Sequence, residues 1–370
     1  GGQKELVYMF SENYTNANLG WEKSYNTNIG VDMAVLKNRI DLAADFYYTK
    51  TKGVIWQRYL PITNGGYNAS TQYYTNMNIC STDNKGVEVT LNTRNIQTKD
   101  FKWSSTLTYS FNKEKVTSLA DGTSNYVTNG NYTLAKGSPV NSFYKYKITG
   151  IWQKGEESDA AVFGQKPGDI KIDIPGLKKS EIGKYVDEEG VEYTADNKYT
   201  ISENDYQIIG HNSPDWTLGL QNTLNWKNFD LSVFMFMRWG QMINYSMLTR
   251  YDPTGANNFP EYFNYWTESN PSNDFPAANA NMALKDYTGY YSLSYVDGSF
   301  FKIKNITLGY NLPKDLLKKF GFEKLRVYGT ITNPFVVAKS HLLKDYDPEM
   351  NGSLNYPLTK QLVFGLNLSF

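Results

Sequence analysis

Two histidines are the side chains of this sequence best suited to acid–base chemistry, and each has a serine nearby. His211 precedes Ser213 by two residues, and His341 directly follows Ser340. A serine hydrolase needs a hydroxyl nucleophile within hydrogen-bond reach of a positioned histidine. Neither pair lies in a GxSxG turn, and the sequence has no HExxH helix. We therefore expect polar loop chemistry here, with no catalytic residue and no enzyme, and a hydrolase built into the fold is a distant alternative.

Metal-binding chemistry is poorly supported as well. Cys80 is the single cysteine and lies far in sequence from both histidines, so it makes a poor metal site and cannot form an intrachain disulfide. The acidic turns Asp196-Asn197-Lys198 and Glu203-Asn204-Asp205 offer oxygen ligands, but their spacing does not match an Asp-x-Asp-x-Asp-Gly calcium loop. We expect no metal and no cofactor.

Aromatic side chains interleaved with asparagines carry a stronger signal. Flat amphipathic rings beside amides suit the faces and hydroxyls of sugars, and they also suit a protein interface. Ordinary packing within loops is the alternative for any single ring. The candidates for contact with a substrate or a partner are Tyr73, Tyr74, Trp152, Trp266, Tyr290 and Tyr291.

The segments that must position these side chains alternate between apolar and polar residues. The last ten residues, Gln361–Phe370, place Leu, Phe, Leu, Leu and Phe at the even positions and mostly small or polar residues at the odd ones. Because successive strand side chains point to opposite faces, this segment predicts a strand with one apolar face. Transmembrane β-barrels characteristically end on such an aromatic residue.

Phe101–Phe111 gives the clearest strand. Phe101, Trp103, Leu107 and Phe111 fall on one face, where we expect lipid, and Lys102, Thr106 and Ser110 fall on the other, where we expect the lumen. A tilted strand climbs ~2.6 Å of membrane normal per residue, so this segment spans ~26 Å, close to the ~25 Å apolar band of a barrel. Buried strands of a β-sandwich are the alternative.

Composition supports a barrel. Aromatic residues make up 15% of the chain, with 30 tyrosines, yet the mean hydropathy is −0.54, which fits aromatic girdles around a polar lumen. The most apolar run, Leu231–Met237, is far shorter than the ~20 residues of a membrane-spanning helix. Basic and acidic residues balance at 37 each, which makes a nucleic-acid partner improbable.

The predicted connections alternate in length. Short polar turns are expected at 37–38, 98–100 and 227–228, and a somewhat longer one at 314–322. The segments between them are long, at 53–83, 112–213, 242–297 and 339–357. Outer-membrane barrels have short periplasmic turns and long extracellular loops, so the long segments are expected to form an extracellular apparatus.

Several short runs resemble, in their order, the C-terminal barrel portion of SusC-like TonB-dependent transporters (the SusC/RagA family) of Bacteroidetes outer membranes. The resemblance covers nearly the whole chain, and the run 297–313 is its most specific part. The runs are Trp21-Glu22, Asn28–Asp32, Asp45–Tyr48, Asn84–Glu88, Pro167–Asp169, Ile208–Gly210 with Pro214, Asp297–Pro313 and Asp347–Glu349. The chain departs from the family in two places. An acidic Asp/Asn/Gly loop that the family often has before Ile208-Ile209-Gly210 is reduced here to Asp196-Asn197-Lys198, which argues against calcium there. Lys302 stands where arginine is commoner in the family.

The resemblance implies a barrel of about 22 strands, with an N-terminal plug, a TonB box and a SusD-like lipoprotein lid over the extracellular mouth. Residues 1–370 then form the C-terminal half, with about ten or eleven strands, and the plug and the first strands lie outside this chain and pair with it. The resemblance also implies that Phe370, Leu368 and Leu366 form a signal for assembly into the membrane.

We therefore expect an outer-membrane protein of all-β barrel fold that imports oligosaccharides actively, driven by TonB through the plug. A peptide importer of the same family and a passive porin are the alternatives. Its partners are expected to be the lipoprotein lid, the remaining part of the transporter, TonB, the substrate and membrane lipid.

Overall fold

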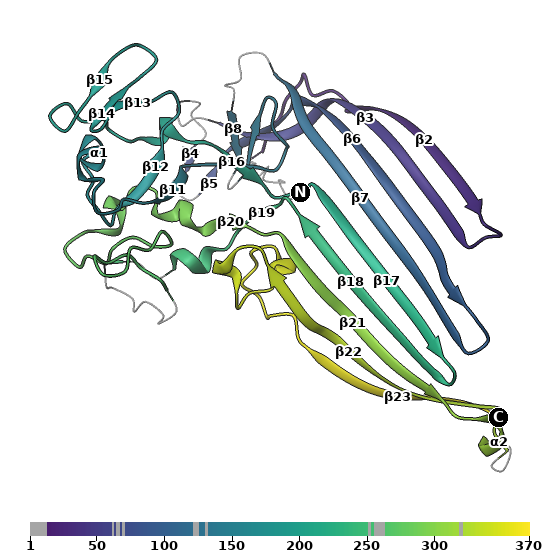
Figure 1. Cartoon of the computed structure of the whole chain (residues 1–370). Helices are drawn as coiled ribbons and strands as arrows, with labels where there is room; N and C mark the ends of the chain where they lie inside the picture. The colour runs from purple at the N-terminus through teal and green to yellow at the C-terminus, as the bar shows by residue number, and fades with distance from the viewer. Residues whose placement is uncertain are drawn as a thin grey trace, which may run out of the picture. The chain divides into compact units, whose positions relative to one another are not determined.

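The structure is a computed structural model that describes residues 13–60, 63, 67–68, 71–120, 126–129, 132–250, 253–254, 263–317 and 321–370. Its dominant element is a sheet of ten strands. Nine of them follow one another along the sheet, and Figure 1 shows the long strands side by side. In sheet order they are β2 (Lys23–Val35), β3 (Ile40–Tyr59), β6 (Tyr74–Gln97), β7 (Phe101–Leu119), β17 (Trp216–Trp226), β18 (Phe229–Trp239), β21 (Phe300–Asn311), β22 (Lys324–Ala338) and β23 (Gln361–Ser369).

The order of the sheet follows the order of the chain, and the pairings whose register is described from β17 to β23 are antiparallel. The tenth strand, β1 (Asn13–Tyr14), pairs in parallel with β6. A meander of this kind is how an antiparallel barrel wall is built. Among the described residues, no helix is long and apolar enough to cross a membrane.

The expected strands exist, but several are longer than their apolar alternation indicates. β7 continues from Phe111 to Leu119, and β3 and β6 likewise extend into the expected 53–83 segment. In the extension of β7 the pattern turns polar at Asn112 and Lys113 while the backbone ladder continues. Backbone hydrogen bonds between strands do not require apolar side chains. The strands therefore continue beyond the point where the apolar alternation of their side chains ends.

Smaller sheets occupy the long connections. One sheet has the order β16 (Gln207–His211), β10 (Ser142–Lys145), β9 (Tyr132–Ala135) and β8 (Tyr126–Asn129). A second joins β13 (Lys178–Glu181), β14 (Lys184–Val186) and β15 (Glu192–Tyr193). Three antiparallel pairs complete the set, namely β11 (Lys147–Ile151) with β12 (Ile170–Asp173), β19 (Met242–Asn244) with β20 (Tyr295–Asp297), and β4 (Tyr67–Asn68) with β5 (Thr71–Gln72).

Helical segments are short. The α-helical ones are α1 (Glu157–Val162) and α2 (Lys314–Leu317). The 3-10 turns are η2 (Glu203–Asp205), η3 (Ser246–Thr249), η4 (Leu284–Asp286), η5 (Tyr290–Ser294), η7 (His341–Leu343) and η8 (Pro348–Met350).

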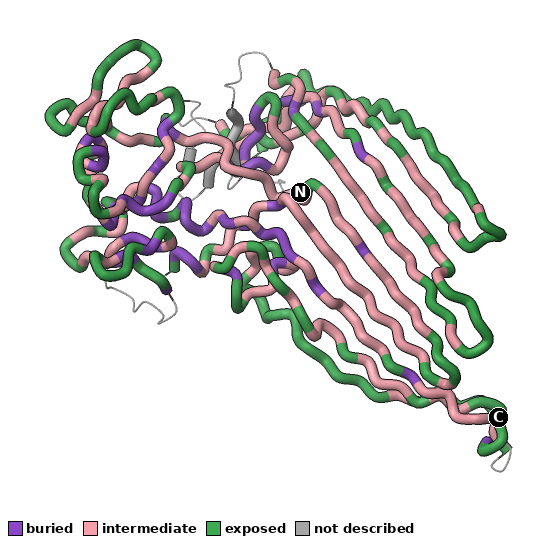
Figure 2. The backbone as a smooth tube through the Cα atoms, in the orientation of Figure 1, coloured by how far each residue is buried: buried purple, intermediate pink, exposed green. Residues whose placement is uncertain are grey.

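The chain divides into two compact units, each with its own core. The first comprises Gly1–Asp32, Ala43–Val89 and Ser110–Ser142, as far as these are described, and buries a small cluster around Ile79 and Val116. The second comprises Met33–Leu42, Thr90–Tyr109 and Phe143–Phe370, and its larger core lies among the loops rather than between the long strands (Figure 2). Members of that core include Ile151, Ile172, Trp266, Phe275, Tyr290 and Leu343. The long connections of the second unit are therefore folded around a core of their own.

Candidate functional site

The register of β17, β18, β21, β22 and β23 separates their side chains into an apolar and a polar face, because directly opposed residues share a face. The apolar face contains rows such as Leu218, Met237, Phe301 and Val337, or Leu224, Leu231, Leu308, Gly329 and Phe364. The polar face contains rows such as Thr223, Ser232, Thr307 and Thr330, or Asn225, Asp230, Gly309 and Tyr328. We call the apolar face the outward face and the polar one the inward face.

Aromatic rows close both ends of the outward face. Trp216 stacks on Trp239 at a centroid distance of 5.9 Å, and at the other end of β18 Phe229 lies 4.7 Å from Tyr310 and 6.2 Å from Trp226. β18 runs from Phe229 to Trp239, which separates the two rows by ~26 Å along the membrane normal. This is the spacing expected of two interfacial girdles.

A bulge in β21 shifts the alternation on this wall. Met235 opposes Ile303 and Phe234 opposes Asn305, so Lys304 is the extra residue. A β-bulge leaves one residue without a partner and re-aims the side chains around it. The outward face accordingly changes from odd-numbered residues before the bulge to even-numbered ones after it.

Beside the bulge, a cluster of ion pairs joins the inward face to the β22–β23 loop (residues 339–360). Lys302 Nζ donates to Asp347 Oδ2 at 2.5 Å and to Glu349 Oε2 at 2.7 Å, and Lys304 Nζ pairs with Glu349 Oε1. The Lys302 side chain is only 1% exposed. Burial acts to raise the pKa of Glu349, but hydrogen bonds and charge from Lys302 and Lys304 outweigh it and hold that pKa below its ordinary 4.5.

Other contacts hold the same loop. The Tyr346 ring packs on Tyr245 at 4.2 Å, and its hydroxyl donates to the Ser353 backbone oxygen at 3.0 Å. Gly352 has a φ of 84°, and a Cβ there would collide with the backbone of Asn244. The β22–β23 loop is thus fixed to the second unit by charge, by ring packing and by backbone fit.

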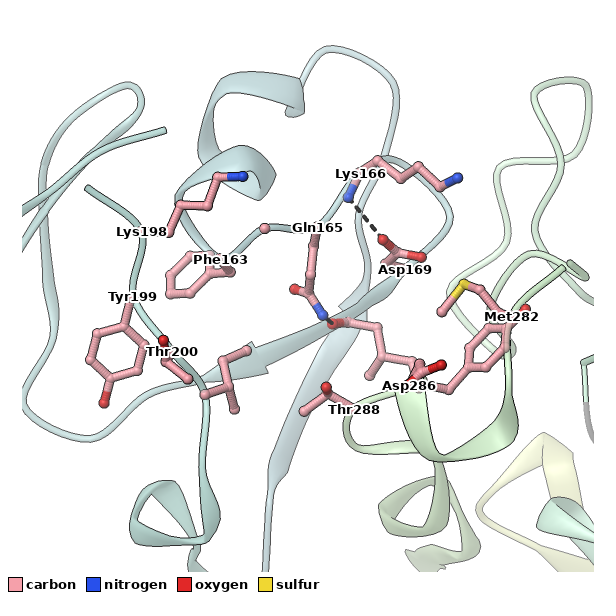
Figure 3. Close-up of a pocket in the computed structure, with 14 residues that line it drawn as sticks. Phe163, Gln165, Lys166, Asp169, Lys198, Tyr199, Thr200, Met282, Asp286 and Thr288 are labelled. Atoms are coloured by element: carbon pink, nitrogen blue, oxygen red, sulfur yellow. Dashed lines mark hydrogen bonds between the residues drawn. The ribbon is translucent and has the colours of Figure 1, made fainter. Parts of the chain in front are cut away.

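The loops of the second unit enclose a cleft of about 570 Å³, shown in Figure 3 and here called the loop cleft. Three segments far apart in the sequence form it, at 163–170, 198–201 and 282–288. The side chains labelled there in Figure 3 are Phe163, Gln165, Lys166, Asp169, Lys198, Tyr199, Thr200, Met282, Asp286 and Thr288.

Asp169 is a carboxylate within the 163–170 wall of the loop cleft. Its Oδ2 accepts a hydrogen bond from the Lys166 backbone N–H at 2.9 Å. Burial raises the pKa of Asp169 above its ordinary 3.8, against that hydrogen bond and the charge of Lys166. Lys198 and Thr288 also line the cleft. The cleft therefore presents charged groups, hydroxyl groups and aromatic ring faces, which together suit a polar solute.

The 163–170 wall of the cleft is supported by tryptophan hydrogen bonds. Trp152 Nε1 donates to Gln165 Oε1 at 2.8 Å, while Gln165 Nε2 donates to the Ile170 backbone oxygen at 3.0 Å. Trp266 Nε1 donates to Gln153 Oε1 at 3.0 Å. The bonds of Gln165 fix this wall, and the bond from Trp266 holds Gln153, the chain neighbour of Trp152.

Comparison with known proteins identifies the family of this chain. No protein-family model matches the chain. TonB-dependent receptor P3 of Formosa agariphila is 30% identical over 100% of this chain and 36% of its own length. TonB-dependent receptor SusC of Bacteroides thetaiotaomicron is 28% identical over 96% of this chain and 32% of its own length. The chain belongs to the SusC-like TonB-dependent receptors.

Solved structures agree with the fold of this SusC-like chain. The structure of the RagAB peptide transporter matches with a TM-score of 0.75 at 24% identity, over 100% of this chain and 38% of that one. The RagAB peptide importer in its closed-closed state matches with a TM-score of 0.70 at 25% identity, over 96% and 36%. The chain therefore spans about a third of the length of its relatives. The expected all-β fold is confirmed as the C-terminal part of a transmembrane barrel, and so is its place in the outer membrane.

The candidate contact residues of this SusC-like chain differ sharply in exposure. Trp152 is 2% exposed and lies between Phe163 and Lys171, and Trp266 and Tyr290 are also buried in the loop core. Tyr291 is 62% exposed. Tyr73 and Tyr74 are half-buried and contact Tyr14 and Tyr59. All six stay candidates for contact with a substrate or partner. The three buried rings, Trp152, Trp266 and Tyr290, would influence binding only indirectly, by holding the loops in shape.

The residues expected to guide assembly lie at one edge of the sheet. Leu366 and Leu368 share the outward face with Val327 and Leu325, which they oppose, and Phe370 directly follows β23 and is 89% exposed. Their apolar surface fits the expected signal, which itself stays a prediction.

The two histidines make local contacts. His211 Nδ1 lies 2.6 Å from the backbone oxygen of Ser213, not its hydroxyl, and His341 Nε2 lies 2.9 Å from Asp274 Oδ1. Cys80 is buried. Where the structure describes the chain, it brings together no group of three or more His, Cys, Asp or Glu side chains able to hold a metal.

Sequence reasoning missed most of the loop cleft. Asp169 lies within one of the runs shared with SusC-like proteins, and this was its one visible signal. Asp286 carried none, and Lys198 was noted only as part of the Asp196-Asn197-Lys198 turn, because tertiary contacts alone bring 198–201 and 282–288 beside 163–170.

Proposed function

We propose that this chain supplies wall, loops and binding surface to an active outer-membrane importer of oligosaccharides. TonB drives it through a plug outside this chain, and a SusD-like lipoprotein covers its extracellular mouth. The observation that carries the proposal is identity of 30% with a TonB-dependent receptor over the whole chain. The loop cleft supports a sugar substrate, since it combines rings with carboxylate, amide and hydroxyl groups.

Peptide import is the second candidate, and a specific observation favours it. The two RagAB structures that share this fold are named as a peptide transporter and a peptide importer. The Lys166, Lys198, Asp169 and Asp286 side chains of the loop cleft also suit the charged ends of a peptide. The two substrates differ in one respect that can be tested, because only the peptide needs complementary charges.

The test is uptake of labelled oligosaccharides and labelled peptides by cells whose complete transporter carries Asp169→Asn. If sugars are imported, this change lowers oligosaccharide uptake a few-fold, because one hydrogen-bonding group is altered while the rings remain. Asp196→Asn, an exposed carboxylate outside the lining of the loop cleft, is the matched control and leaves uptake unchanged. Deletion of TonB abolishes uptake by an active importer, whereas undiminished uptake identifies a passive porin.

The exposure of each aromatic candidate distinguishes rings that can contact the substrate from rings that only support the fold of the loops. Tyr291→Ala removes an exposed ring and lowers uptake without changing the amount of folded protein. Trp152→Ala empties a buried site, which costs about 3–5 kcal/mol, so it opens the loops to protease. Shortening of the expected loop segments 112–213 or 242–297 releases the lipoprotein during co-purification. Intact uptake and intact lid retention after shortening would contradict the proposal.

A further inference from the structure

An apolar groove of about 580 Å³ crosses β18, β21, β22 and β23 near the ends that carry the short turns. Its lining includes Phe229, Leu308, Tyr310, Gly329, Phe364 and Leu366. We call it the Gly329 groove. The register places all six of these residues on the outward face.

The groove exists because one outward position lacks a side chain. Gly329 lies between Leu308 and Phe364, which oppose it on the neighbouring strands. A Cβ at Gly329 would lie 3.3 Å from the Phe364 ring, so even an alanine would narrow the groove. Phe364 and Leu366 are 78% and 64% exposed, so they form open walls rather than a packed core.

The end of the groove at the turns has the features of a membrane interface. The ring row of Trp226, Phe229 and Tyr310 crosses it there, and aromatic rings gather at the level of lipid headgroups. Lys227 occupies the turn between β17 and β18, and its Nζ lies 5.7 Å from the centroid of Trp226. Trp226 belongs to the outward face, so this ammonium lies on the lipid side of the wall.

We propose that the Gly329 groove binds one acyl chain of a glycerophospholipid whose phosphate is held near Lys227. The outward face is in contact with the membrane, and an acyl chain is the apolar partner that a membrane supplies there. Short turns lie on the periplasmic side of outer-membrane barrels, so the lipid comes from that leaflet. Each methylene group of the acyl chain that enters the groove leaves the mobile hydrocarbon of the bilayer and packs closely against Leu308 and Phe364.

Native mass spectrometry of the complete transporter, purified in detergent and washed, measures the phospholipid that stays bound. We expect one retained phospholipid, and about tenfold weaker retention in Gly329→Leu, whose side chain fills the groove. Gly329→Ala gives an intermediate loss. Lys227→Gln weakens retention about fivefold through the headgroup alone. Val233→Leu enlarges an outward side chain outside the groove and is the matched control that retains lipid.

Heat-dependent mobility in gels shows whether each variant is a folded barrel. If Gly329→Leu does not fold, Gly329→Ala and Lys227→Gln still decide the result. A photoreactive p-benzoylphenylalanine in place of Phe364 identifies the occupant, and we expect an adduct with phospholipid. An adduct with protein alone would show that a neighbouring strand fills the groove and would overturn the proposal. Equal lipid retention by wild type, Gly329→Ala and Gly329→Leu would overturn it as well.

Discussion

Lys302 is a buried cation whose ion-pair partners, Asp347 and Glu349, both come from the β22–β23 loop. An ammonium that is 1% exposed needs close counter-charges, because its removal from water is costly. Asp347 and Glu349 supply two carboxylates, and Lys304 balances the second of them. The sequence runs 297–313 and 347–349 both resemble SusC-like proteins, and this cluster gives a physical reason for their pairing.

Removal of the Lys302 charge should release the β22–β23 loop. Lys302→Met leaves Asp347, whose side chain is 13% exposed, without its cation, and loss of one partner of a buried ion pair costs about 3–5 kcal/mol. We expect much faster hydrogen exchange of the backbone amides at 341–353, with the ladder between β21 and β22 unchanged. Lys302→Arg keeps the charge and is the control. Equal exchange in Lys302→Met and wild type would show that ring packing alone holds the loop.

The same cluster predicts how the loop responds to acid. The pKa of Glu349 is lower in the folded protein than its ordinary 4.5, because Lys302 and Lys304 outweigh the effect of burial. A depressed folded pKa contributes stability that is present above the unfolded value and is lost as the pH falls through the folded value. Exchange protection of 341–353 should therefore be constant from neutral pH down to about 5 and decline below about 4.5. A decline already complete at pH 6 would contradict the role of Glu349.

At the scale of strands, simple alternation describes the outward residues of β23 but not those of β21. β23 has no bulge, so its even residues stay on one face from Leu362 to Leu368. In β21 the extra residue Lys304 shifts the pattern, and strict alternation would turn either Ile303 or Ile306 the wrong way. The lengths of β3, β6 and β7 were also underestimated, because backbone pairing continues where the apolar pattern stops.

Spin labels on β7 test the two faces directly. Leu107→Cys should place a label in lipid, and Thr106→Cys should place one in the aqueous lumen, since the Thr106 hydroxyl donates to the polar side chain of Asn92 at 2.7 Å. Cys80 is buried, so it should not compete for the label. We expect oxygen to relax the spin at 107 more strongly and a water-soluble nickel complex to relax it more strongly at 106. Equal access of the nickel complex to both positions would contradict the assignment of faces.

At the scale of the whole molecule, the barrel wall was predictable and the loop cleft was not. Wall strands neighbour one another in sequence and repeat one simple pattern, so each segment carries its own signal. Lys198 and Asp286 meet near Asp169 only because long connections fold around a shared core. The same core explains why the candidate contact residues Trp152 and Trp266 are buried.

Assembly of the barrel gives the last prediction. Leu362, Phe364, Leu366 and Leu368 form an apolar outward edge that Phe370 extends with a ring 89% exposed. Family resemblance suggests that the machinery for barrel insertion recognises this edge. Deletion of Phe370 should therefore lower the amount of mature transporter in the outer membrane several-fold, measured by immunoblot of membrane fractions. Asn367→Ala, on the inward face of the same strand, is the control, and an unchanged amount after deletion would show that Phe370 only contacts lipid.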